Sequence, residues 1–134
     1  MTLSDQNFPQ EILPRDGENA LRRAKVAAQV IADHRGHDIV IMDLRTQTAA
    51  FDYFVIATGS SQRQLRTMCD AVDDVFQKEL NDKKLGVEGQ HTGRWMLLDY
   101  GDVLVHLFDE ETRDYFRLED LWSGGERVEF TPAE

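Results

Sequence analysis

The chain has 134 residues, of which 25 are acidic and 15 are Lys or Arg, so its formal net charge is -10 at pH 7. This length fits one domain with a proper core. The negative charge disfavours any binding mode that neutralises phosphates, so we expect no direct nucleic-acid specificity, whereas a basic protein would be attracted. A single cysteine excludes an internal disulfide, and no apolar window is long enough to cross a bilayer. We therefore expect a cytoplasmic domain without a membrane anchor.

The first 60 residues predict an arm, a helix and two strands. Residues 1–16 show no hydrophobic periodicity, which indicates a mobile N-terminal arm. From 17 to 35, apolar residues recur at helical spacing, and Gly36 stands where the helix should stop. Two short apolar runs, 39–44 and 52–58, are typical of neighbouring strands.

The next segment predicts a long helix and a connection. Ser61 and Gln64 have the spacing of a capping box, in which each side chain satisfies a backbone N–H at the helix start. The apolar residues that follow trace one continuous stripe as far as Leu80. Residues 81–93 are polar and contain glycines, so we expect a connection there.

The segment from Gly93 to Phe108 predicts a β-hairpin that turns at Gly101. With a two-residue loop at either Tyr100-Gly101 or Gly101-Asp102, the alternation of side chains gives one apolar face and one mixed face. The apolar face, expected in the core, consists of Met96, Leu98, Val103, Val105 and Leu107. The mixed face consists of Trp95, Leu97, Asp99, Leu104, His106 and Phe108.

The mixed face of this hairpin allows two interpretations. An aromatic anchor beside carboxylates has the composition of an interface hot spot that meets basic groups. Alternatively, the face lies under a helix, and Asp99 and His106 pair with each other. The residues alone leave both interpretations open.

A short helix, an anchor and a tail complete the chain. Residues 109–116 carry acids in the first turn, where a carboxylate suits the helix macrodipole. The expected anchor consists of Leu118, Leu121 and Trp122. Since Ser123-Gly124-Gly125 should break the structure, we predict a single domain over 17–122 and a C-terminal tail over 123–134.

Three motifs typical of enzymes or metal sites have simpler explanations. Gly59-Ser60 at a strand-to-helix turn can hold a phosphate, but no closely spaced carboxylates follow on a strand to hold a divalent metal ion. His34 and His37 have a His-x-x-His spacing, yet Gly36 lies between them and no further Cys or His joins them. Cys69 falls on the apolar stripe of its helix. We therefore predict no catalytic residue, no bound metal ion and no cofactor.

Two sequence blocks resemble a known family. They are 52–64, which reads DYFVIATGSSQRQ, and 93–106, which reads GRWMLLDYGDVLVH. Both are similar to the ribosomal silencing factor family, also called Iojap-like, and the similarity runs from about Asn19 to Trp122. The resemblance implies an α/β fold with a mixed β-sheet flanked by helices, nucleotidyltransferase-like but without the catalytic acids.

The resemblance also implies a function without chemistry. A family member binds the large-subunit ribosomal protein L-fourteen and sterically blocks joining of the two ribosomal subunits, which represses translation when nutrients are scarce. The implied contact residues are Trp95, Leu97, Asp99, Tyr100, Asp102 and His106. On this basis Trp95→Ala or Asp102→Lys should abolish binding to the large subunit while the domain stays folded. A homodimer is a further implied assembly.

Two other function classes remain open from the sequence. One is a vestigial or active nucleotidyltransferase, which would turn over nucleotide in the presence of a metal ion. The other is a generic dimeric protein-binding module, which would show a dimeric mass in solution and no affinity for the ribosome.

Overall fold

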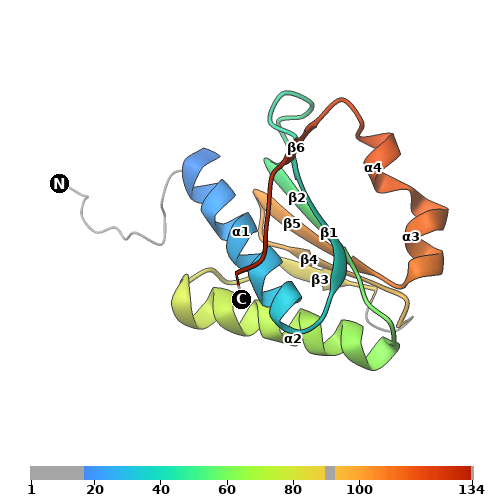
Figure 1. Cartoon of the computed structure of the whole chain (residues 1–134). Helices are drawn as coiled ribbons and strands as arrows, with labels where there is room; N and C mark the ends of the chain where they lie inside the picture. Colours follow the sequence, from blue (N-terminus) through green and yellow to red (C-terminus); the bar gives the residue numbers. More distant parts are fainter. Residues whose placement is uncertain (1–16, 90–92, 134) are drawn as a thin grey trace.

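The computed structural model of the chain describes residues 17–89 and 93–133, so the predicted N-terminal arm lies outside the described residues. The elements in chain order are α1 (Gly17–Asp33), β1 (His37–Asp43), β2 (Tyr53–Thr58), α2 (Gln62–Glu79), β3 (Gly86–Glu88), β4 (Trp95–Asp99), β5 (Val103–Phe108), α3 (Glu110–Phe116), α4 (Leu118–Leu121) and β6 (Glu126–Val128). The strands form one mixed sheet in the order β3-β4-β5-β2-β1-β6. Helices α1 and α2 lie against one face, and α3 and α4 lie on the other (Figure 1). The predicted α/β fold with a mixed sheet flanked by helices is confirmed.

The centre of the sheet is the pair β2 and β5, which run parallel with Tyr53 opposite Val103 and Thr58 opposite Phe108. All other strand pairs are antiparallel. Every residue of β2 is buried, because helices cover both faces of the sheet at this position. A strand that is buried on both faces is a continuous apolar run, which explains why 52–58 shows no polar alternation.

Helix α1 packs closely on the sheet because its inner stripe consists of small residues. Ala20, Ala24, Ala27 and Ala28 are all fully buried in the core. The helix ends where expected: Arg35 takes a left-handed φ of 69°, and the N–H of Gly36 donates to the carbonyl oxygen of Ile31 at 2.9 Å. A Cβ atom on Gly36 would lie 2.3 Å from Cγ2 of Ile31, so the position requires glycine.

Helix α2 begins with the predicted cap and covers the core with its apolar stripe. The hydroxyl oxygen of Ser61 accepts the N–H of Gln64 at 3.1 Å, while the side-chain oxygen of Gln64 accepts the N–H of Ser60 instead of that of Ser61. Cys69 is buried as expected, and burial raises the pKa of its thiol to about 11, which makes it an unreactive core residue.

In the described ranges, no helix has both the length and the apolar character that a membrane span requires.

The predicted hairpin is formed by β4 and β5. The N–H of Tyr100 donates to the carbonyl oxygen of Val103 at 3.0 Å, and Asp99 pairs with Leu104, so the loop is Gly101-Asp102, one of the two expected positions. Gly101 has a φ of 90°, which a two-residue loop of the II′ kind needs at its first position. The predicted apolar face is confirmed, because all five of its side chains are buried in the core beneath α1 and α2.

Short edge strands occupy two segments that were expected to be irregular. β3 lies within 81–93 and pairs with β4, and β6 lies within the predicted tail and pairs with β1. A strand of three residues is too short for alternation to show in the sequence. The expected anchor also differs in part: Leu118 and Trp122 pack against the sheet, whereas Leu121 is 73% exposed.

Candidate protein-interaction site

The sheet face beneath α3 and α4 is thinly covered. Its buried apolar cluster consists of Met42, Leu44, Phe54, Ile56 and Phe108, with Val40, Phe51, Trp95, Leu104, Leu118 and Trp122 partly buried around it. Neither α3 nor α4 contains a buried residue of its own. This face therefore leaves apolar side chains at the surface, particularly along β4, which lies towards the β3 edge of the sheet.

Three of the expected contact residues lie on β4, on this mixed face. Trp95 and Leu97 are half-buried, and Leu97 lies opposite His106 on β5. Asp99 is also half-buried, and its Oδ1 accepts the N–H of Gly101 at 2.8 Å, so this carboxylate stabilises the turn. Trp95, Leu97 and Asp99 are consequently available at the hairpin surface.

Two of the expected contact residues lie on the opposite side, among the groups packed by α1 and α2. Tyr100 is 5% exposed, its hydroxyl donates to Oδ1 of Asp73 at 2.8 Å, and burial together with this hydrogen bond raises its pKa. Asp102 is 3% exposed, and its carboxylate accepts a hydrogen bond from the guanidinium of Arg23. Arg23 also forms an ion pair with Asp82 at 2.8 Å.

The burial of Asp102 corrects one expectation from the sequence. A lysine at position 102 would place a second cation against Arg23 in a site that excludes water. Two buried like charges strongly destabilise a fold. We therefore expect Asp102→Lys to unfold the domain, in place of the expectation from the sequence that it stays folded.

The sixth expected residue, His106, is a buried neutral ring. It is 7% exposed, and neither of its ring nitrogens has a hydrogen-bond partner among the described residues. Its ring packs edge-on against Phe54, with centroids 4.5 Å apart. Burial lowers the pKa of His106 to about 4, so the ring is uncharged at neutral pH. Asp99 and His106 therefore do not form the pair that one interpretation of the sequence proposed.

A pair of exposed aromatic residues on α3 completes the surface around Trp95. Tyr115 is 81% exposed and Phe116 is 47% exposed. The ring centroid of Phe116 lies 6.1 Å from that of Trp95 and 5.3 Å from that of Tyr115. We call Trp95, Tyr115 and Phe116 the aromatic ledge. The sequence signal for this surface was the adjacent pair Tyr115-Phe116 at the end of a helix whose other residues are all polar.

A hollow of about 420 Å³ lies within the aromatic ledge. Its lining adds Arg94, Glu111 and Thr112 to the three aromatic residues. The Glu111 side chain is 79% exposed and lies 3.5 Å from Arg94, and the neighbouring residues Glu110 and Asp114 are exposed as well. Arg94 partly neutralises Glu111, but the acids around the hollow outnumber it, so the net acidic rim suits an apolar side chain that is flanked by basic residues.

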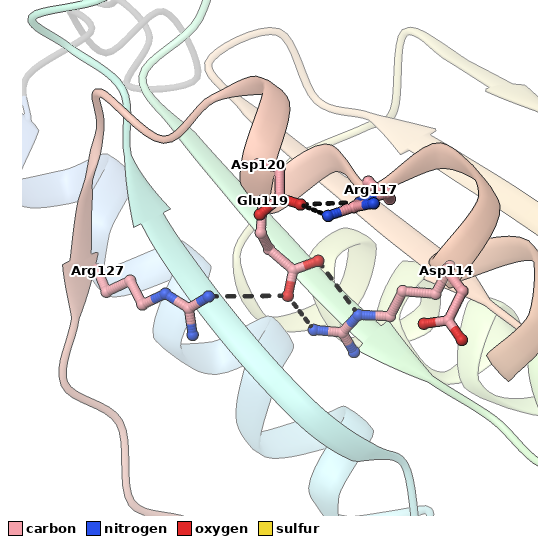
Figure 2. A pocket seen from close by; sticks show the side chains of 6 residues that line it. Asp114, Arg117, Glu119, Asp120 and Arg127 are labelled. Carbon is pink, nitrogen blue, oxygen red and sulfur yellow. Dashed lines mark hydrogen bonds and ion pairs between the residues drawn. The ribbon is translucent and has the colours of Figure 1, made fainter.

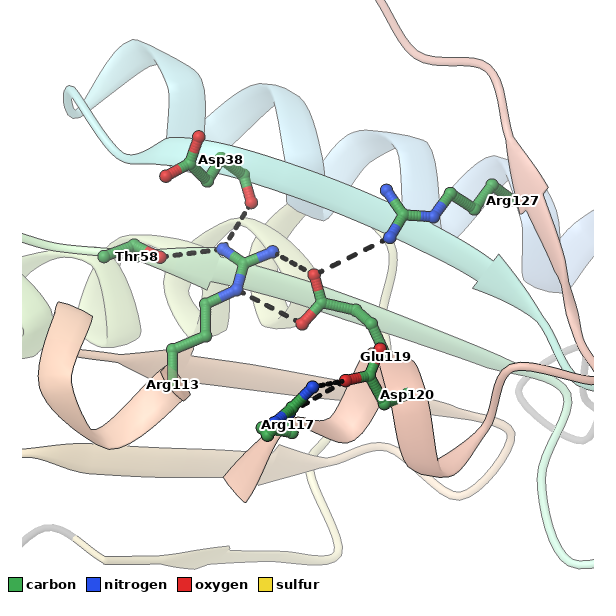
Figure 3. Close-up of polar contacts among 7 residues, drawn as sticks. All are labelled: Asp38, Thr58, Arg113, Arg117, Glu119, Asp120 and Arg127. Atoms are coloured by element: carbon green, nitrogen blue, oxygen red, sulfur yellow. Dashed lines mark hydrogen bonds and ion pairs between the residues drawn. The ribbon is translucent and has the colours of Figure 1, made fainter. Parts of the chain in front are cut away.

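A polar junction, formed by Thr58, Asp38, Arg113 and Glu119, fixes α3 and α4 to the sheet. Arg113 donates to Oγ1 of Thr58 at 2.7 Å, to the backbone oxygen of Asp38, and to both carboxylate oxygens of Glu119 (Figure 3). The pKa of Glu119 is lowered overall: burial alone would raise it, but the hydrogen bonds and the charge of Arg113 have the larger combined effect. The junction therefore sets the position of α3, and with it the position of Tyr115 and Phe116.

A second hollow, of about 380 Å³, adjoins this junction (Figure 2). Its lining is charged, but the charges satisfy one another: Arg113 and Arg127 lie at Glu119, and Arg117 lies 2.6 Å from Asp120. These ion pairs stabilise the junction, and they leave few charged groups available to bind a ligand.

Comparisons with known proteins point to one family. A family model described as ribosomal silencing factor during starvation matches residues 17–134. A ribosomal silencing factor RsfS from Chromobacterium violaceum is 37% identical over 107 residues, which are 80% of this chain and 86% of that protein. A mouse protein named mitochondrial assembly of ribosomal large subunit protein 1 is 28% identical over 82% of this chain and 49% of its own length.

The fold has a close counterpart among solved structures. A crystal structure of a Chromobacterium violaceum protein superposes with a TM-score of 0.73 at 35% sequence identity, over 85% of this chain and 93% of that chain. The nucleotidyltransferase-like part of the expected fold is not tested by this similarity and stays a prediction.

Proposed function

Because the chain belongs to the ribosomal silencing factor family, whose members are ribosome-associated regulators of translation and not known enzymes, we propose that it represses translation by binding the large ribosomal subunit. The proposed partner is ribosomal protein L-fourteen, and the proposed effect is a steric block of subunit joining under nutrient limitation. The name of the mouse relative refers to the large subunit and supports the choice of subunit. The family description refers to starvation and supports the nutrient condition.

The observation that carries the proposal is the aromatic ledge with its acidic rim. Tyr115 and Phe116 are exposed although they are large aromatic residues, and Trp95 lies beside them. Aromatic side chains dominate binding energy at interfaces when a partner buries them. Ribosomal proteins are basic, and the net charge of -10 attracts a basic partner while it repels bare RNA.

The structure revises the set of contact residues that we propose. Trp95, Leu97 and Asp99 remain in it, and Tyr115 and Phe116 join it. Tyr100, Asp102 and His106 are buried, so we assign them to support of the hairpin and not to direct contact. Their substitution would weaken binding only through a change in the fold.

No chemical step is needed for this function. A protein interface of ordinary size covers about 800 Å² on each partner, which is enough to prevent a second large body from docking at the same place. The ledge then needs only to bind the large subunit tightly enough, and at a place that the small subunit would otherwise occupy.

Sedimentation with separated ribosomal subunits tests the proposal. The wild-type chain should pellet with the large subunit and not with the small one, and it should slow subunit joining as followed by light scattering. Trp95→Ala should lose both effects while its circular dichroism is unchanged. Thr67→Ala is the control, because Thr67 is exposed on α2, which covers the opposite face of the sheet from the ledge. Absence of large-subunit binding by the wild type would refute the proposal.

The same preparation separates the two other function classes. Calorimetry with ATP and magnesium should show no heat, since a nucleotidyltransferase would bind nucleotide. A dimeric mass in solution together with no affinity for the ribosome would favour the generic dimeric protein-binding module instead.

A further inference from the structure

Three metal-ligating side chains meet at the junction of β1 and α3. His37 and Asp38 open β1, and Glu110 opens α3. One ligand atom from each residue can be chosen so that all three lie within 4.8 Å of one another. His37 is half-buried, and the two carboxylates are exposed. Glu110 is far from His37 along the chain, so the His-x-x-His spacing of His34 and His37 gives no indication of this group.

The three side chains have no other partner within the described part of the chain. No hydrogen bond or ion pair engages the His37 ring or the carboxylates of Asp38 and Glu110, whereas the neighbouring Glu119 is paired with Arg113. Two carboxylates held close together repel each other unless a cation lies between them. The His37 imidazole adds a nitrogen ligand atom to the two carboxylates, so the group is more than a patch of surface acids.

The surroundings of the group are also acidic. It lies at a hollow of about 890 Å³ that is lined by Asp38, Glu110, Glu111, Asp114 and Glu119 against two arginines, Arg113 and Arg127. An excess of carboxylates raises the local concentration of cations.

We propose that His37, Asp38 and Glu110 bind a divalent transition-metal ion. One imidazole nitrogen and two carboxylate oxygens form a mixed donor set that suits ions such as Zn²⁺, while Mg²⁺ prefers oxygen ligands and retained water. Metal–ligand bonds of about 2.0–2.2 Å need ligand atoms about 3.4 Å apart, which rotation of the exposed carboxylates supplies. Water fills the remaining coordination positions.

The bound ion would tie α3 to the start of β1. Helix α3 has no buried residue, and Arg113 is its principal polar link to the sheet. A metal ion at His37, Asp38 and Glu110 adds a second link at the first turn of the helix that carries Tyr115 and Phe116. The site does not depend on the proposed ribosomal function.

Titration calorimetry of the full chain with Zn²⁺, compared with Mg²⁺, tests the site. The wild type should bind Zn²⁺ saturably and more tightly than Mg²⁺. His37→Gln and Glu110→Gln should each weaken Zn²⁺ binding about tenfold or more, since each removes one of three ligands. The matched controls are His34→Gln and Glu79→Gln, which make the same chemical changes outside the hollow: Nδ1 of His34 lies 2.9 Å from the Val30 oxygen, and Glu79 is exposed at the end of α2.

Thermal unfolding gives a second readout that does not rely on heats of binding. Saturating Zn²⁺ should raise the unfolding midpoint of the wild type and of both controls, but not that of His37→Gln, because only the native state holds the three ligands together. The proposal is overturned by absence of saturable Zn²⁺ binding, by equal affinities for Zn²⁺ and Mg²⁺, or by ligand variants that bind Zn²⁺ as the controls do.

Discussion

The two faces of the sheet differ in how helices cover them. Helices α1 and α2 bury their own apolar stripes against one face, where Ala24, Ile31 and Phe76 have no exposed surface. On the other face, α3 and α4 bury none of their own residues, and the polar junction at Arg113 fixes them. The first face therefore supplies most of the stability, while the second keeps apolar surface that a partner can bury. Substitutions whose effects are confined to one face test this difference in stability and binding.

The largest expected effect is at Asp102, at the end of the hairpin that α1 covers. Asp102→Lys should unfold the domain, and Asp102→Asn should lower the free energy of unfolding by about 3 kcal/mol, because it removes the more deeply buried of the two carboxylates paired with Arg23 and leaves only Asp82. Urea unfolding followed by circular dichroism measures both. Asp74→Asn, in an exposed ion pair with Lys78, should change the free energy by less than about 0.5 kcal/mol. Equal losses at the two positions would contradict the buried, paired state of Asp102.

The second effect is a pH dependence that arises on the other face, at His106. The folded pKa is lowered to about 4, below its ordinary value of 6.5, so the unfolded chain binds more protons between these two pH values. Stability should therefore be highest above pH 6.5 and fall as the pH decreases towards 4, by about 3 kcal/mol from this residue.

A variant without the imidazole isolates this contribution. His106→Phe keeps an aromatic ring beside Phe54 and cannot be protonated. Urea unfolding of both proteins at several pH values between 4 and 7 should give a smaller slope for the variant. Identical slopes would show that His106 is not buried in its neutral form.

The third effect is on the polar junction. Arg113→Met removes the hydrogen bonds to Thr58 and Glu119, which should cost about 2 kcal/mol. Amide hydrogen exchange should accelerate in α3 and α4 but not in α1 or α2. Arg117→Met, which breaks only an exposed pair with Asp120, is the control and should leave exchange nearly unchanged. Faster exchange throughout the sheet would mean that the two faces are not independent.

The smallest effect on stability should come from the aromatic ledge. Tyr115→Ala should change the free energy of unfolding by no more than about 0.5 kcal/mol, because the side chain is 81% exposed. Phe76→Ala, which empties a fully buried position under α2, should cost about 3–5 kcal/mol. Thermal unfolding compares the two, and a large loss at Tyr115 would mean that the ledge is part of the core.

Strand alternation predicted both faces of the hairpin correctly, because the pleat of a strand fixes which side chains share a face once the loop has two residues. The same reasoning did not reveal that α1 places Arg23 over the turn, so Asp102 was expected at the surface. Tyr115 and Phe116 were not proposed as contacts, because their exposure depends on how α3 lies across the sheet. The group of His37, Asp38 and Glu110 likewise forms only in the folded chain, and spacing along the sequence does not show it.

The affinity for isolated ribosomal protein L-fourteen tests the central claim most directly. The double variant Tyr115→Ala/Phe116→Ala should bind at least about 30-fold more weakly than the wild type, which corresponds to about 2 kcal/mol for an aromatic hot spot. Its unfolding midpoint should stay close to that of the wild type, and Thr67→Ala, on the opposite face, should bind as the wild type does. Undiminished affinity of the folded double variant would contradict the account of the aromatic ledge.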